Sequence, residues 1–165
     1  MIEESFYETY HFDAACRDVR GSTDRLCMLL TACGQQKDTA VDAQGLAKAL
    51  VEKVSFESEL TAVSDEELGY YFQLPEGCTA AAYMSSGSTA EEVFVIQCKS
   101  GDDAAALRAS MQEFLDSQKT EMERYLPAEV DRINSAIFET YGACVVLCVS
   151  SDTDTARSVI KEYVK

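Results

Sequence analysis

Two stretches of this chain repeat the same order of patterns, and this doubling limits the possible folds more than any other feature. In residues 79–125, a polar loop separates two apolar runs, and a turn leads to a long segment with apolar residues at helical spacing. Residues 133–165 show the same order with few identities. A strand–strand–helix unit that occurs twice predicts an α+β fold, in which a four-stranded antiparallel sheet carries two helices on one face.

In the first unit, residues 79–84 and 92–99 are the predicted strands. The second of these is apolar on both faces from Val93 to Ile96, which is typical of a central, covered strand. Ser100 or Asp102 can cap the helix that follows, and Pro127 ends it.

In the second unit, the predicted strands are residues 135–139 and 143–149, with a tight turn at Tyr141 and Gly142. A helix follows from about Thr153, capped by Ser151 or Asp152. When Val95 is aligned with Val146, the two helices match with one residue of slip.

Two shorter helices are predicted before the doubled units, and we expect them to pack around the sheet. Residues 41–54 place Leu46, Ala49, Leu50 and Val54 at helical spacing. Ser64 and Glu67 form a capping box that starts a helix through about residue 72. Residues 41–165 are therefore expected to form a single domain with an internal repeat.

The charge balance argues against partners that carry a dense negative charge. The 165 residues hold 14 Lys and Arg against 29 Asp and Glu, a net charge of −15. Such a surface repels phosphate backbones and anionic lipid headgroups, so no nucleic-acid partner is expected.

Residues 1–25 are polar and aperiodic, which predicts a poorly ordered leader, and residues 26–40 follow as a short apolar run and a polar tether. Leu30, Thr31, Ala32 and Cys33 resemble a bacterial lipobox, in which the precursor is lipidated on the cysteine and cleaved before it. This motif predicts a lipid anchor on Cys33. A short buried helix that happens to end in Ala-Cys explains the same residues equally well.

The loop between the first two strands is the candidate ligand loop, because hydroxyl groups at an exposed tip can contact polar ligands. It consists of Ser85, Ser86, Gly87, Ser88 and Thr89. A serine nucleophile needs a base within hydrogen-bond reach, and the one histidine is His11, in the leader. A hairpin loop is therefore favoured over a catalytic site, and no catalytic residue is predicted.

Neither a metal site nor a cofactor is predicted. Four cysteines fall in the folded part: Cys78, Cys98, Cys144 and Cys148. They form no C-x-x-C pair and no histidine accompanies them, so buried structural thiols are favoured over zinc ligands, a functional cysteine or a disulfide. Acidic residues at the starts of the two repeat helices are interpreted as caps rather than calcium ligands.

Several motifs, in order, resemble the domain-of-unknown-function family DUF4358. They are the run from Tyr83 through the serine-rich loop to Val93, the pair Gln118-Lys119, the segment from Tyr125 to Glu129, and the turn at Tyr141-Gly142. Members of this family are mostly lipoproteins of Gram-positive bacteria without an established activity. The resemblance implies lipidation at Cys33 and location on the outer side of the cell membrane.

The resulting hypothesis is an extracytoplasmic, lipid-anchored domain that acts as a non-enzymatic binding or protein-interaction module, with an unknown protein or small ligand as partner. Two alternatives remain at this point. One is a small hydrolase that uses acidic and hydroxyl groups, and the other is a cytoplasmic regulatory domain that dimerises.

Overall fold

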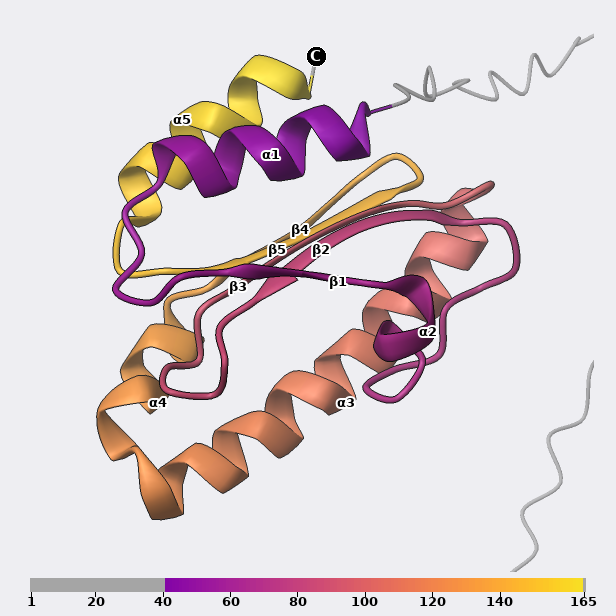
Figure 1. Ribbon diagram of the computed structural model, residues 1–165. Coiled ribbons are helices and arrows are strands. Elements are labelled where there is room, and N and C mark those ends of the chain that lie inside the picture. The colour runs from indigo at the N-terminus through magenta and orange to yellow at the C-terminus, as the bar shows by residue number, and fades with distance from the viewer. Residues whose placement is uncertain (1–40, 165) are drawn as a thin grey trace, which may run out of the picture. The chain divides into compact units, whose positions relative to one another are not determined.

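A five-stranded antiparallel sheet forms the centre of the fold in the computed structural model of the protein, which describes residues 41–164 (Figure 1). Its strands are β1 (Thr61–Val63), β2 (Thr79–Met84), β3 (Glu92–Gln97), β4 (Ile137–Tyr141) and β5 (Cys144–Val149). They lie in the order β1-β2-β3-β5-β4, and every neighbouring pair is antiparallel. The predicted leader and tether, with Cys33, fall outside the described residues.

The two central strands, β3 and β5, are buried on both faces, as the apolar sequence of β3 predicts. Val95 pairs with Val146, and both side chains belong to the core on one face. Phe94 pairs with Leu147, and both belong to the core on the other face. Because side chains alternate along a strand, both sets need cover from helices.

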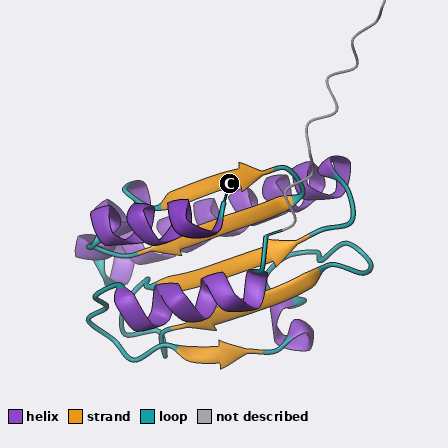
Figure 2. Cartoon of the chain, turned by 90° about the horizontal axis from the view of Figure 1, so that it is seen from above, coloured by secondary structure: helices purple, strands orange, loops and turns teal. Residues whose placement is uncertain are grey.

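One face is covered by α1 (Ala43–Lys53) and α5 (Thr153–Tyr163), which lie side by side and run nearly parallel to the strands (Figure 2). The predicted apolar stripe of α1 is confirmed, since Leu46, Ala49 and Leu50 are buried against the sheet. Val159 and Ile160 of α5 join the same core.

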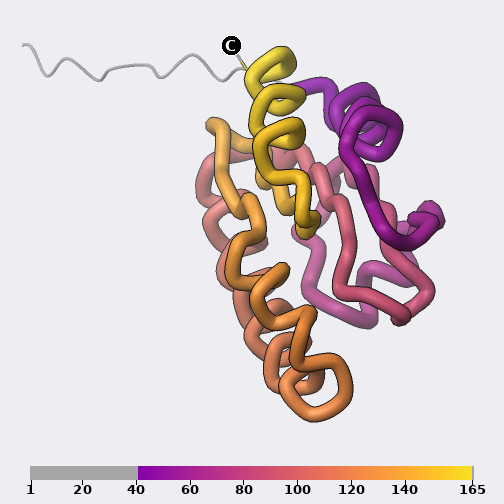
Figure 3. Tube along the Cα trace, turned by 90° about the vertical axis from the view of Figure 1, so that its left-hand side faces the viewer, coloured from indigo at the N-terminus to yellow at the C-terminus, as the bar shows by residue number. Residues whose placement is uncertain are grey.

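The opposite face is covered by the long helix α3 (Gly101–Tyr125), with α4 (Pro127–Asn134) and the short α2 (Asp65–Leu68) (Figures 1 and 3). Leu107 and Met111 of α3 are fully buried against the strands. Leu68 of α2 is fully buried and belongs to the same core.

Local signals explain where these helices begin. The capping box of α2 is present, with the Ser64 hydroxyl accepting from the Glu67 backbone and the Glu67 carboxylate accepting from the Ser64 backbone. Ser100 caps α3 through the Asp103 N–H. Pro127 occupies the first turn of α4, where its missing N–H has no intrahelical partner to lose.

The α+β class and the antiparallel sheet are confirmed, but some details differ from the prediction. The sheet has a fifth strand, β1, which is too short and too exposed to show an alternating pattern. The strand predicted at residues 135–139 lies at 137–141, because α4 continues to Asn134. The helix that starts at Ser64 ends at Leu68 rather than near residue 72.

The expectation that both repeat helices lie on one face is wrong. α3 packs on Phe94 and Leu147, whereas α5 packs on the opposite face with Val95 and Val146. If the two units were related by symmetry, a half-turn about an axis perpendicular to the sheet would carry β3 onto β5 and β2 onto β4, because β3 and β5 are antiparallel neighbours. Such a rotation does not exchange the two faces of the sheet, so it would leave α3 and α5 on the same face. No rotation therefore superimposes the two units, and the repeat argument fails.

The one residue of slip between the two units accounts for this difference. When Val95 is aligned with Val146, the N-cap of α3, Ser100, follows five residues later and the N-cap of α5, Asp152, six residues later, so the second unit has one additional residue before its helix. Successive residues of an extended chain point to opposite faces, so one added residue redirects the chain from one face to the other.

Within residues 41–164, no helix combines the length and apolar character needed to cross a membrane.

Candidate functional site

The serine loop (residues 85–89) forms the connection between β2 and β3, as predicted. The Ser85 N–H donates to the Glu91 carbonyl at 3.0 Å, and the Ser85 hydroxyl donates to the Thr89 carbonyl at 2.6 Å. Gly87 has a φ of 91°, which favours glycine, and a Cβ placed there would meet no atom within 4 Å. The loop is therefore closed by its own hydrogen bonds and has an open tip.

Hydroxyl groups join the serine loop to the segment that follows α1. The Ser58 and Ser88 hydroxyl oxygens lie 3.0 Å apart, and the Thr89 and Ser58 hydroxyl oxygens lie 3.1 Å apart. These contacts bring together residues that are some thirty positions apart in the sequence. Ser58 was not predicted as a site residue, and nothing in its neighbourhood of the sequence distinguishes it.

Beneath these hydroxyls lies Glu91, whose side chain is fully buried. Its carboxylate accepts the backbone N–H groups of Glu57 and Ser58 at 2.9–3.0 Å and the Thr89 hydroxyl at 3.2 Å. A buried carboxylate needs such donors, since an unpaired one would cost several kcal/mol. Glu91 thus holds the serine loop against the segment after α1.

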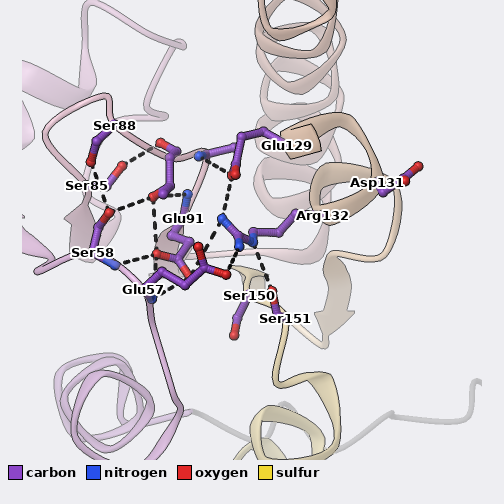
Figure 4. Close-up of polar contacts among 12 residues, drawn as sticks. Glu57, Ser58, Ser85, Ser88, Glu91, Glu129, Asp131, Arg132, Ser150 and Ser151 are labelled. Carbon is purple, nitrogen blue, oxygen red and sulfur yellow. Dashed lines mark hydrogen bonds and ion pairs between the residues drawn. The ribbon is translucent and has the colours of Figure 1, made fainter. Parts of the chain in front are cut away.

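Arg132 of α4 provides the cation of the site (Figure 4). Its guanidinium binds the Glu57 and Glu129 carboxylates and lies 4.0 Å from Glu91, and its Nε donates to the Ser151 hydroxyl at 3.1 Å. The Arg132 side chain is only 9% exposed. One positive charge is therefore shared among the buried carboxylates of Glu91 and Glu129 and the exposed carboxylate of Glu57, and the cluster is negative overall.

Glu129 connects this cluster to the residues just before β3. Its Oε2 accepts the Ala90 N–H at 2.9 Å and an Arg132 N–H at 2.6 Å. The neighbouring Asp131 points away from the cluster in Figure 4. Most oxygens of the cluster receive donors from the chain itself, an arrangement that fixes loops in place rather than one that presents a free base.

An open hollow of about 540 Å³ adjoins the cluster. Ser58, whose N–H binds Glu91, also lines this hollow. Its lining combines apolar side chains with a few polar groups: Val51, Val54, Ser55, Phe56, Ser58, Glu59 and Leu60. Polar groups make up the larger part of the surface that this lining exposes, so the hollow offers hydrogen-bonding groups beside a smaller apolar area.

A second buried polar pair lies at the start of β3, on the face covered by α3. The Glu92 carboxylate accepts from Gln118 Nε2 at 3.3 Å, and burial raises the pKa of Glu92 from 4.5 to about 8. Among the described residues, Glu92 Oε1 and Gln118 Oε1 are buried and receive no hydrogen bond. We interpret Glu92 as a neutral acid at pH 7, because a proton on it supplies the donor that this pair lacks.

The remaining candidates have structural positions. Asp152 caps α5 through the Thr155 N–H, as predicted. Phe72 packs against Phe94 and Phe114, so it is core, whereas Tyr70 and Tyr125 are 80% and 74% exposed. Cys98, Cys144 and Cys148 are buried, in agreement with structural thiols, and Cys78 is half-buried.

Sequence reasoning missed the charged part of the site: Glu91, Glu129 and Arg132. One signal was available for Glu92, which opens the strand predicted at residues 92–99, and for Glu91, which stands directly before it. Both faces of that strand are expected to be covered, so a carboxyl group at its start is expected to be buried. Nothing in the local sequence of α4 indicates that Arg132 would reach them.

Comparison with known families supports the resemblance seen in the sequence motifs. The model of the family described as "Domain of unknown function (DUF4358)" matches residues 52–150. This range contains the sheet, the serine loop and all three carboxylates that surround Arg132. Neither the curated proteins nor the solved structures include a match. Because the matched range is more than half of the chain, the protein belongs to the DUF4358 family.

Proposed function

We propose that this protein is a non-enzymatic binding module, tethered by a lipid on Cys33 outside the cytoplasmic membrane. Its ligand-binding end consists of the serine loop and the adjoining hollow. Its partner is a protein that presents an apolar side chain next to a positively charged group.

The observation that carries the proposal is the position of Ser58. Its hydroxyl contacts Ser88 and Thr89 of the serine loop, and the same residue lines the hollow. The loop is held from below by Glu91, so its shape exists before a ligand arrives. A preformed site binds more tightly than one that must be ordered on binding.

The chemistry of the partner follows from the lining and the charge. Phe56 and Leu60 supply apolar surface in the hollow, and Glu59 adds a carboxylate to its lining. The chain as a whole carries a net charge of −15. Such a field speeds association with cationic partners and repels anionic ones.

The sheet faces themselves are not the binding surface in this proposal, because helices cover both of them. Binding therefore falls to the loops at the strand ends, where contacts to a partner are most often made.

Mass spectrometry of the membrane fraction tests the anchor. Cys33→Ser should abolish lipidation and release the protein from membranes, whereas Cys27→Ser, in the same apolar segment, should leave both unchanged. The lipobox at Leu30 to Cys33 motivates this experiment. A full-length, unlipidated product in the cytosol would refute the anchor and would favour a cytoplasmic regulatory domain.

Site-specific photocrosslinking in the native cell tests the binding end. A photoreactive amino acid at the exposed position Ser86 should give a discrete crosslinked protein, whereas the equally exposed Asp102, at the start of α3, should not. Equal crosslinking at both positions, or none at Ser86, would contradict a binding role for the loop. Turnover of ester or peptide substrates that stops on Glu91→Gln would instead favour the hydrolase alternative.

A further inference from the structure

Cys78 and Cys98 lie opposite each other where β2 begins and β3 ends. The last pair of the ladder is Thr79 with Gln97, and Cys78 and Cys98 are the next pair in the same register. Residues that face each other across an antiparallel pair point to the same side of the sheet. Both cysteines accordingly contact the core that α3 covers.

Cys78 and Cys98 form the type of antiparallel pair in which the two Cα atoms lie closer together. The Cys98 N–H donates to the Ala143 carbonyl, towards β5 and away from β2, and the Cys78 N–H donates to the Pro75 carbonyl. Cys78 and Cys98 are therefore a non-hydrogen-bonded pair, for which the Cα atoms lie about 4.5 Å apart. Disulfides span Cα separations of about 4.4–6.8 Å.

The two sulfur atoms are already close, with an Sγ–Sγ distance of 2.9 Å. This is closer than the ordinary van der Waals contact of two unbonded sulfur atoms, so a small rotation of the side chains is enough to bond them. The side chain of the neighbouring Lys99 lies across Gly77, where a Cβ would come 2.2 Å from Nζ.

We propose that Cys78 and Cys98 form a reversible disulfide that closes the β2–β3 hairpin. The inference concerns these two thiols alone and does not depend on the anchor at Cys33 or on the binding role of the serine loop.

The oxidant is a small-molecule disulfide, for example oxidised glutathione. The half-exposed Cys78 attacks it as a thiolate, forms a mixed disulfide and releases one thiol. Cys98 then gives up its proton and attacks the Cys78 sulfur, which releases the second thiol. Two protein thiols are oxidised and one disulfide is reduced to two thiols.

The order of these steps follows from burial. Cys98 is buried, and desolvation together with the Cys78 contact raises the pKa of its thiol to about 12. Cys98 is therefore a poor first nucleophile towards a dissolved disulfide, whereas a sulfur 2.9 Å away is within its reach once the mixed disulfide has formed.

Peptide mass mapping of the full chain after treatment with oxidised glutathione tests the proposal. Among the four cysteines of residues 41–164, the expected product is one peptide pair joined through Cys78 and Cys98, while Cys144 and Cys148 remain reduced thiols inside the core. The melting temperature should rise by roughly 10 °C and return to its first value with dithiothreitol.

Two variants sharpen the test. In Cys98→Ser, glutathione should remain attached to Cys78, because the resolving thiol is missing. In Cys148→Ser, which leaves the pair intact, the bridge should form as in the wild type. The proposal is overturned if the oxidised wild type keeps both thiols free, retains glutathione on Cys78, or links Cys78 to a cysteine other than Cys98.

Discussion

Replacing Glu92 by Gln should have little effect on stability at pH 5 and should make the protein more stable than wild type at pH 9. The Glu92 carboxyl is fully buried, and desolvation raises its pKa from 4.5 to about 8, while the hydrogen bond from Gln118 opposes this shift. A Gln side chain has nearly the same shape as a protonated Glu. It offers an amide donor to Gln118 and cannot ionise.

The magnitude follows from the two pKa values. The unfolded chain loses this proton near pH 4.5, and the folded protein keeps it up to about pH 8. Between these values the folded state holds one more proton than the unfolded state, so the free energy of unfolding falls as the pH rises. At about 1.4 kcal/mol for each pKa unit, the loss through Glu92 is about 5 kcal/mol by pH 9. Below pH 4.5 both states are protonated, and the contribution is fully present.

Urea unfolding followed by circular dichroism at pH 5, 7 and 9 measures this effect as the difference between variant and wild type. Carboxyl groups with lowered pKa values, such as Glu67 and Glu139, titrate in both proteins and cancel in the difference. Glu91→Gln is the matched control. It should be destabilising at all three pH values, because the Glu91 carboxylate accepts backbone N–H groups. A difference for Glu92→Gln that changes by less than about 1 kcal/mol from pH 5 to pH 9 would refute the reasoning.

Two further predictions concern the cluster and the turn of the second hairpin. Arg132→Met should lower the free energy of unfolding by about 3–5 kcal/mol, because it leaves buried carboxylates without their cation. Arg157→Met removes a half-exposed ion pair and should cost less than about 1 kcal/mol, so equal losses in urea unfolding would contradict the assigned role of the cluster. Gly142→Ala should cost about 1–2 kcal/mol, because Gly142 has a φ of 58°. Gly101→Ala, where a Cβ meets no atom within 4 Å, should be close to neutral in the same urea unfolding experiment.

The parts of the fold that could be predicted from the sequence are those with a local cause. The stripe of α1, the capping box at Ser64 and the limits of β2 depend on residues within a few positions of each other. Each of them appears in the structure where the sequence indicated. The loop after β2 is equally local, since its hydroxyl-rich composition and Gly87 mark a connection between two apolar runs.

The parts that could not be predicted depend on contacts between distant segments. Strand β1 is a strand only because Ala62 pairs with Tyr83, and its three residues have no periodicity of their own. Arg132 belongs to the site because α4 packs beside the start of β3. Its partner Glu57 is 75 positions away in the sequence. Long-range placement of this kind follows from how the elements pack, and local propensity carries no information about it.

The departure from the repeat and the composition of the site have a common cause. With one additional residue before its N-cap, α5 lies beside α1 rather than beside α3, and the Ser150 hydroxyl donates to the Ser55 carbonyl at 3.1 Å. The next residue, Ser151, accepts a hydrogen bond from Arg132. The segment after α1 is thereby held at the end of the sheet where the serine loop emerges, so that Ser58 reaches Ser88. If α5 followed the symmetry of the repeat, it would share a face with α3, and these anchors for the segment after α1 would be lost. The asymmetry of the two units is therefore what assembles the candidate binding end.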